Sequence, residues 1–327
     1  MKRHKSLRWV ARIPWFALLL TTVLLRTSGV AAQNQSQQVY YFPKPLKPAP
    51  YVAPMKPLVR LAELKAKHHG ETNWTESVVE DYYNRVEVIA AAPGSVLSPY
   101  LHADSPEYWY VEEGTIRFTI DDPPGKTQTF VAEKGSLVFA PERMLHSLEV
   151  LGNEPAIRVQ VTLREASAIF AEKPANPAAG MEYIPMRLST EANPYDVPNP
   201  GGKPDRLFFN LDQMIQEHGT QRDWEDLVIM RNRAHANIIC GYAADAKHTP
   251  GDRGHFHDFP EIWVIMRGQL KFSIEGESPF VASQGDIIYA LSTRWHRAEP
   301  VGEGPACRLA MTPFPAGNHL FDPLPQK

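Results

Sequence analysis

Three features that this sequence lacks narrow the choice of protein class. The formal net charge is only −3, with 34 basic residues against 37 acidic ones. A chain without a basic excess has no electrostatic footprint for nucleic acid, so that class of function is not expected. The longest apolar run near the start, Ile13–Leu25, is shorter than the ~20 residues that a membrane-spanning helix needs. Cysteine is also scarce, with Cys240 and Cys307 as the two examples.

The same N-terminal run has the three regions of a secretory signal peptide. A basic stretch, MKRHKSLRWVAR, precedes the apolar run, and small residues at Val30 and Ala32 follow it. We therefore expect cleavage after Ala32 and export of a soluble mature protein, to the periplasm or to the medium, without stable insertion in a membrane.

The two cysteines leave two readings open. Both lie in β-like runs of the C-terminal half, NIICGYA and ACRLAM. In an oxidising compartment they can pair across neighbouring strands. Two buried free thiols fit the pattern equally well, because cysteine is among the most buried residue types. Neither cysteine has the setting of a catalytic nucleophile.

The distribution of the other residues predicts an all-β fold. The 30 prolines concentrate in connecting stretches, which favours short elements over long helices. Short runs such as TIRFTI, IRVQVTL and QLKFSI alternate apolar and polar residues, and Gly, Pro and Asp clusters separate them. This pattern is typical of strands in small antiparallel barrels or sandwiches.

The chain reads as one unit present twice. Glu107–Ile120 aligns with Glu261–Ile274 without a gap, and upstream HHGETNW resembles EHGTQRDW. Each copy follows a leucine-bearing segment with weak helical spacing, so a short helix is expected before each barrel. The predicted layout is a signal peptide at 1–32, a Pro-rich extension at 33–75, a first domain at 76–172, a linker with a short helix at 173–225, and a second domain at 226–327.

The head of one predicted strand carries an unusual polar cluster. GHFHDFPEIWVIMRG places His255, His257 and Glu261 before a run of large apolar residues. Residues two apart on a strand share a face, so the two histidines point to the same side, and Glu261 returns to it. Buried polar groups need a partner, and a metal ion is a frequent one. We expect His296, after the run GDIIYA, to supply a fourth ligand.

These residues resemble the two motifs of the cupin superfamily. The first motif is complete at its ligands in His255, His257, Glu261 and Gly268, and the second is represented by Gly285 and His296. Leu291 and Thr293 stand where the family usually has proline and glycine, a departure that affects a turn rather than a ligand. The resemblance implies two tandem double-stranded β-helix barrels, jelly-roll-like, and one divalent metal bound by three histidines and a glutamate.

The first copy matches the same motifs with one loss. Tyr100 occupies the place of the first histidine, and the remaining ligands are His102, Glu107 and His146, with Arg143 in place of the usual glycine. Those three residues can hold a metal, with Tyr100 as a fourth ligand if the ion lowers its pKa. A polar cluster without metal fits the sequence equally well.

The resemblance also implies a chemistry. Members that cleave rings or oxidise flavonols suggest a dioxygenase acting on a small, oxygen-chelating substrate, such as an aromatic one. An oxalate-decarboxylase-like reaction and a non-catalytic metal or small-ligand binder are the alternatives. Mixed nitrogen and oxygen ligands suit Fe(II), which we favour, and also Mn, Ni, Cu or Zn. Homo-oligomers are common in the family, but no pattern here demonstrates an interface.

Several residues are expected around the second site. Trp263, Ile265 and Phe272 fall on the inward register with Glu261 and are expected to line a substrate pocket, although plain core packing fits them as well. Glu261 and Arg294 are the candidates for catalytic roles, Glu261 as a ligand and Arg294 as an anchor for a carboxylate or enolate. A place on the solvent-exposed rim is the other reading of Arg294.

Overall fold

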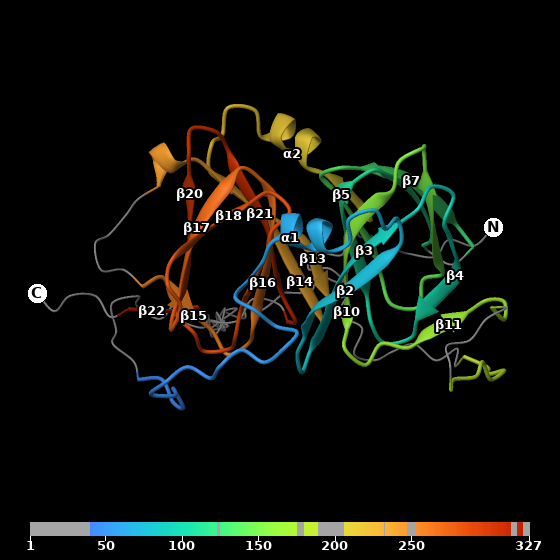
Figure 1. The fold of residues 1–327 in the computed structure, drawn as a ribbon, viewed down its shortest axis with the longest axis horizontal. Coiled ribbons are helices and arrows are strands. Elements are labelled where there is room, and N and C mark those ends of the chain that lie inside the picture. Colours follow the sequence, from blue (N-terminus) through green and yellow to red (C-terminus); the bar gives the residue numbers. More distant parts are fainter. Residues whose placement is uncertain are drawn as a thin grey trace, which may run out of the picture. The chain divides into compact units, whose positions relative to one another are not determined.

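The computed structural model describes residues 40–122, 125–174, 180–188, 206–231, 233–246, 253–314 and 319–322. The predicted signal peptide lies outside these residues. Among the residues described, no helix combines the length and apolar character needed to cross a membrane. Within this part of the chain the strands form four antiparallel sheets, two for each copy of the repeat, so the all-β prediction is confirmed (Figure 1).

The first barrel consists of two sheets. One follows the order β12-β8-β5-β10-β3-β2 and the other the order β11-β4-β9-β6-β7. Their bounds are β2 Trp74–Glu80, β3 Asn84–Ala91, β4 Val96–His102, β5 Glu107–Glu113, β6 Thr115–Asp121, β7 Thr127–Glu133, β8 Ser136–Ala140, β9 His146–Leu151, β10 Ala156–Leu163, β11 Ala168–Phe170 and β12 Phe208–Asn210.

The second barrel repeats this plan. Its sheets follow the orders β1-β19-β16-β21-β14-β13 and β18-β17-β20-β15-β22. Their bounds are β1 Leu58–Val59, β13 Trp224–Arg231, β14 Ala234–Gly241, β15 His255–Phe256, β16 Glu261–Arg267, β17 Gln269–Ile274, β18 Phe280–Ser283, β19 Ile287–Ala290, β20 His296–Val301, β21 Ala306–Thr312 and β22 Leu320–Phe321. A 3-10 turn, Ala243–Asp245, follows β14.

The sequence repeat coincides with a structural one. The aligned segments become the consecutive strands β5 and β6 in the first barrel and β16 and β17 in the second. In each barrel the chain passes from one sheet to the other between these two strands. The glycine at this connection has a positive φ in both barrels, 76° at Gly114 and 68° at Gly268. A Cβ there would lie 2.7 Å from the Cα of Ala156 in the first barrel and 2.5 Å from the carbonyl of Pro305 in the second. Both the backbone conformation and the lack of space therefore require glycine.

Each barrel is completed by the segment that precedes the other. The short strand β1, ahead of the first barrel, pairs with β19 of the second, and β12, ahead of the second barrel, pairs with β8 of the first. Figure 1 shows the blue extension running beside the orange strands. Helix α1, Leu61–Lys67, follows β1, and helix α2, Leu211–His218, follows β12, as the leucine-bearing segments predict. This exchange ties the barrels together.

A shared apolar core reinforces this connection. One hydrophobic cluster contains buried side chains of both barrels, among them Val86 and Val88 of β3 and Leu309 and Met311 of β21. The hydroxyl of Tyr110 in β5 donates to the carbonyl of Met266 in β16, at 3.4 Å.

Cys240 and Cys307, whose pairing the sequence left open, form a disulfide. Cys240 of β14 and Cys307 of β21 face each other directly in the strand register.

Candidate metal centre

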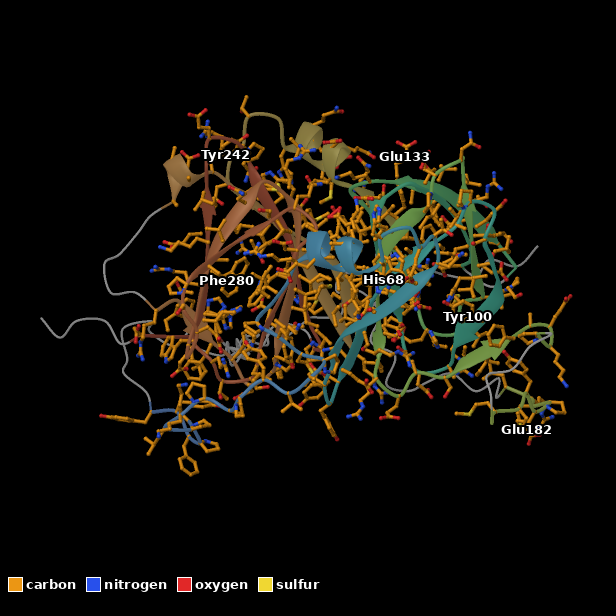
Figure 2. The ribbon with its side chains drawn as sticks, in the orientation of Figure 1. His68, Tyr100, Glu133, Glu182, Tyr242 and Phe280 are labelled. Atoms are coloured by element: carbon orange, nitrogen blue, oxygen red, sulfur yellow. A yellow bond between two sulfur atoms is a disulfide. The ribbon has the colours of Figure 1, made fainter. Side chains whose placement is uncertain are left out.

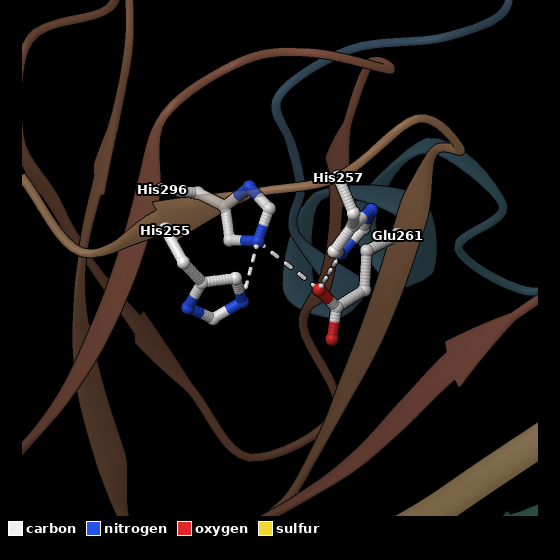
Figure 3. Close-up of side chains that lie close together, drawn as sticks. All are labelled: His255, His257, Glu261 and His296. Atoms are coloured by element: carbon white, nitrogen blue, oxygen red, sulfur yellow. Dashed lines mark hydrogen bonds and ion pairs between the residues drawn. The ribbon is translucent and has the colours of Figure 1, made fainter. Parts of the chain in front are cut away.

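The second barrel brings the four predicted ligands together (Figure 3). Strand β15 supplies His255, the loop after it His257, and the first residues of β16 and β20 supply Glu261 and His296. One ligand atom from each lies within 4.8 Å of all the others. The Nε2 atoms of His257 and His296 are 2.8 and 3.1 Å from Oε2 of Glu261, and the Nε2 atoms of His255 and His296 are 3.2 Å apart.

Backbone carbonyls orient two of these imidazoles. Nδ1 of His257 donates to the carbonyl of Phe259 at 2.7 Å, and Nδ1 of His296 donates to that of Arg294 at 2.8 Å. With the proton on Nδ1, a neutral ring directs the lone pair of Nε2 toward the cluster, as a metal ligand requires. Lone pairs that converge on a carboxylate oxygen repel unless a proton or a cation lies between them. The donor set therefore fits a divalent metal.

The electrostatics of the cluster favour bound positive charge. Burial alone would raise the pKa of Glu261, but its contacts with His257 and His296 outweigh burial and hold that pKa well below its usual range. Burial lowers the pKa of His257, yet the neighbouring carboxylate of Glu261 leaves it raised overall. Burial, together with His296, lowers the pKa of His255 to about 3, so this ring is neutral at physiological pH. A metal ion can replace the proton that His257 attracts.

The turn before the last ligand keeps its shape despite the missing motif glycine. Thr293 has a φ of 63°, and its counterpart Arg143 has a φ of 66°. Thr293 donates its backbone N–H to the carbonyl of His257 at 2.9 Å, and Arg143 donates to that of His102 at 2.8 Å. In each barrel, this hydrogen bond joins the turn before the last histidine ligand to the backbone of the second histidine ligand. The departure from the motif changes a turn residue and leaves the ligands in place, as predicted.

The first barrel gathers three ligands around one oxygen. The Nε2 atoms of His102 and His146 each lie 3.0 Å from Oε2 of Glu107. Their Nδ1 atoms donate to the carbonyls of Ser167 and Met144, so both rings have the same orientation as in the second barrel. The ligand atoms of the three residues again lie within 4.8 Å of one another.

Tyr100 completes this cluster as a hydrogen-bond donor. It lies on β4 (Figure 2), and its hydroxyl donates to the same Oε2 of Glu107 at 2.8 Å. Burial and the charge of Glu107 raise the pKa of Tyr100 well above 10. For Glu107, burial acts in the opposite direction to the imidazole contacts, which prevail and lower its pKa to about 2. Coordination by Tyr100 requires loss of its proton, and that role stays a prediction that these contacts do not favour.

The predicted pocket residues form the packed wall beside the second cluster. Trp263, Ile265 and Phe272 are at most 3% exposed and belong to one apolar cluster inside this barrel. The ring of Trp263 lies 5.2 Å from that of His296 and 5.4 Å from that of Phe272. These contacts are what core packing requires, and the role in a substrate pocket stays a prediction.

Arg294 has a different environment from the one expected of a substrate anchor. Its guanidinium pairs with Glu277 at 3.0 Å, donates to the carbonyls of Glu275 and Ala49, and stacks on the ring of Tyr51. Ala49 and Tyr51 belong to the N-terminal extension, so Arg294 fastens that segment to the barrel. A role in anchoring substrate is not supported by these contacts.

Two further histidines lie close to the second cluster. The ring of His319, beside β22, is 4.4 Å from that of His255 and 5.6 Å from that of His257. Burial lowers the pKa of His235 in β14, and the negative charge of Glu261 opposes this effect. No motif spacing points to His319, because it reaches the site from the far end of the domain. His235 reads in the sequence as an ordinary strand residue.

Comparisons with known proteins agree with this architecture. The cupin domain family model matches residues 87–161, and the AraC-like ligand-binding domain model matches residues 236–318. A tryptophan-to-phenylalanine variant of Bacillus subtilis oxalate decarboxylase shares 16% identity, with a TM-score of 0.52 over 83% of this chain and 80% of that one. The structure of the B. subtilis enzyme at pH 4.6 shares 16% identity, with a TM-score of 0.50 over 81% and 78%. No curated protein matches the sequence.

The barrels, their duplicated clusters and these matches define the class of fold. The chain has the two-barrel cupin fold, that of a bicupin, with a candidate metal cluster in each barrel. At 16% identity the likeness to oxalate decarboxylase concerns the fold.

Proposed function

We propose that this chain is a metal-dependent bicupin enzyme whose second barrel oxidises a small, oxygen-chelating substrate with dioxygen. The observation that carries the proposal is the convergence of His255, His257, Glu261 and His296, whose ligand atoms lie within 4.8 Å of one another. A buried cluster of three imidazoles and a carboxylate is more than structural stabilisation of a barrel requires.

The residues in and beside the cluster would have different roles in the proposed reaction. The three imidazoles and Glu261 would hold the ion, and their single negative charge would leave a divalent metal with a net positive charge of about one. A divalent ion held there supplies Lewis acidity and, if it is redox-active, electrons for dioxygen. The packed wall of Trp263 and Phe272 limits access of water from one side. We favour Fe(II), because an oxidation by dioxygen requires a redox-active ion. Mn, Ni and Cu are alternatives of the same kind, whereas Zn fits the ligands but would not supply electrons.

A second candidate function is decarboxylation of a small dicarboxylate. It is supported by the presence of an imidazole–carboxylate cluster in both barrels and by the fold shared with oxalate decarboxylase. The proton that Tyr100 shares with Glu107 weighs against it, because the phenol occupies the place of a ligand in the first site.

We further propose that the mature protein is exported. The N-terminal pattern of a signal peptide supports this, and so does the cross-strand disulfide between Cys240 and Cys307, since disulfides persist mainly in oxidising compartments.

Metal analysis tests the site. His257→Ala should lower the affinity of the second barrel for divalent metal by more than about 100-fold, because it removes a ligand, without unfolding the protein. The matched control is His218→Ala, since His218 bonds to Asp226 and stacks on Trp224 away from the cluster. Elemental analysis and far-UV circular dichroism provide the readouts. Unchanged metal content in His257→Ala would remove the basis of the proposal.

A substrate panel separates the candidate reactions. Oxygen uptake with catechols, flavonols and diketones is expected for the dioxygenase, whereas carbon dioxide released from oxalate would identify the decarboxylase. A protein that retains metal but responds to none of these compounds would point to a non-catalytic binding role.

A further inference from the structure

Each barrel has an arginine at the same place in the repeat, buried in the first barrel and partly buried in the second. Arg158 is the third residue of β10, and Arg308 is the third residue of β21. Arg158 lies opposite Ile89 on β3, and Arg308 lies opposite Ile239 on β14. The two positions are therefore structurally equivalent, and neither belongs to the motifs that supply the ligands.

Strand alternation directs Arg308 into the second barrel. Ala306 and Ala310, two residues to either side, belong to the apolar cluster inside this barrel, which also contains Trp263. Cys307 and Leu309, in between, belong to the core that the two barrels share. Successive side chains on a strand point to opposite faces, so Arg308 shares the inner face with Trp263 and with the cluster's Glu261.

The guanidinium groups have charge partners but incomplete hydrogen bonding. Glu261 is the carboxylate with the largest electrostatic effect on Arg308. Arg158 is only 6% exposed, and Tyr100 and Glu107 are its strongest electrostatic neighbours. Nevertheless, Nε of Arg308 and both Nε and Nη1 of Arg158 have no hydrogen-bond partner among the described residues. A buried donor without an acceptor costs about 1–3 kcal/mol, so these atoms call for an acceptor.

Neutralising the negative charge of Glu107 and Glu261 does not account for the incomplete hydrogen bonding of the two arginines. Oε2 of Glu107 is already engaged by Tyr100 and two imidazoles, and its buried Oε1 has no hydrogen-bond partner among the described residues. Neither arginine forms a hydrogen bond or ion pair with the glutamate of its own cluster in the described part of the chain. A guanidinium that approaches a carboxylate without bonding to it leaves its planar fork for another oxyanion.

We propose that Arg308 anchors a carboxylate of the substrate inside the second barrel while another oxygen of the same molecule faces the His255, His257, Glu261 and His296 cluster. Arg158 offers the equivalent contact in the first barrel. The inference rests on the proposed function and specifies the substrate class, a small acid with one carboxylate and a second oxygen donor. The residues two positions to either side of Arg308 are alanines, and Ala310 stands where the first barrel has the larger Gln160.

Oxalate and its uncharged diamide, oxamide, test the anchor. Isothermal titration of the Zn(II)-loaded protein measures binding without redox turnover. Arg308→Lys should weaken oxalate binding about 10- to 100-fold and leave oxamide binding and Zn(II) content unchanged, because lysine keeps the charge but loses the bidentate fork. Arg308→Met should weaken it further. Arg158→Lys reports on the first barrel in the same way. The control is Arg222→Met, which removes an exposed guanidinium that pairs with Asp245 on the second domain.

Unchanged oxalate affinity in Arg308→Lys and Arg308→Met would overturn the inference. So would loss of Zn(II) from Arg308→Lys with the preference for oxalate over oxamide intact, since that result assigns the arginine to charge compensation of Glu261. The proposed enzyme activity can fail separately: a protein that binds oxalate through Arg308 but converts no substrate keeps the anchor and loses the function. If no metal binds, the same titrations on metal-free protein still compare the variants.

Discussion

The two barrels share a backbone plan but differ in what closes their clusters. In the first, the phenol of Tyr100 donates a proton to Glu107. In the second, His255 offers a neutral imidazole whose Nε2 lies 3.2 Å from that of His296. One substitution therefore exchanges a donor for an acceptor at the same place. The first cluster can satisfy itself by internal hydrogen bonds, whereas the second needs a cation or additional protons.

The inner faces of the two barrels also differ in whether they carry a pair of opposite charges. Arg85 and Glu87 on β3 correspond to His235 and Asn237 on β14, as their positions opposite β10 and β21 show. The first barrel thus places a pair of opposite charges, 3.9 Å apart, where the second has an imidazole and an amide. The first barrel therefore pairs charges internally at a place where the second barrel has no pair of opposite charges.

The disulfide is the feature of the second barrel whose removal should have the largest effect on stability. Cys240 and Cys307 face each other where the first barrel pairs Ala90 with Ile157. The double variant Cys240→Ala/Cys307→Ile should lower the free energy of unfolding by about 3 kcal/mol, because the bond closes a loop with a sequence separation of 67. Guanidinium denaturation under oxidising conditions measures this loss. If wild type and variant unfold at the same denaturant concentration, the crosslink does not constrain the chain.

The barrels also differ at the residue beneath the exchanged helix α1. Glu112 in β5 corresponds to Met266 in β16, and its Oε1 lies near Gly285 of the second barrel. Burial raises the pKa of Glu112 to about 8. The neutral form is therefore favoured in the folded state, so its contribution to stability is complete below about pH 4.5 and is lost as the pH rises through 8.

Glu112→Gln should remove this pH dependence. At pH 8.5 the variant is expected to be more stable than wild type by about 2 kcal/mol, with little difference at pH 4.5. Thermal unfolding across that range provides the measurement, and Glu113→Gln, which removes an exposed pair with Lys65, is the matched control. Parallel curves for wild type and Glu112→Gln would show that Glu112 is charged in the folded protein.

Exchanging the closing residue tests the comparison itself. Tyr100→His should raise the affinity of the first barrel for Zn(II) about 10-fold, equivalent to about 1.4 kcal/mol, because an acceptor replaces the phenolic donor. Tyr100→Phe removes the hydrogen bond without adding a ligand and should not reproduce the gain. His255→Tyr should weaken the second site. Calorimetric titration of metal-free protein resolves the two sites, and equal affinities in Tyr100→His and Tyr100→Phe would count against a four-ligand requirement.

Residue spacing was sufficient to predict the parts that repeat. The gapless match of Glu107–Ile120 with Glu261–Ile274 predicts two copies of one β unit, and motif spacing predicts the ligands that the structure brings together. Period-two alternation is a local signal, and it follows directly from strand geometry. The swap of β1 and β12 between the barrels has no such signal, because strands of two and three residues are too short to show periodicity.

Contacts between distant segments account for what the sequence missed. His319 reaches the cluster because β22 pairs with β15, a long-range pairing that no spacing rule specifies. Arg308 reads as a polar residue on a strand until the register places its neighbours Ala306 and Ala310 inside the barrel. Arg294 is two residues before a ligand, but the extension that it binds lies far from it in sequence. Side-chain direction at a strand end depends on such partners.

The turns before the last histidines provide the smallest test. Thr293 and Arg143 both adopt a left-handed conformation, which costs a non-glycine residue about 1 kcal/mol, and most for a β-branched one. Thr293→Gly should therefore stabilise the protein by about 0.5–1 kcal/mol. Arg143→Gly should gain less, because threonine alone of the two is β-branched. Chemical denaturation measures both changes, with metal content as a check that His296 keeps its place. A larger gain for Arg143→Gly would mean that the turn of the first barrel is more strained than that of the second, which contradicts the prediction.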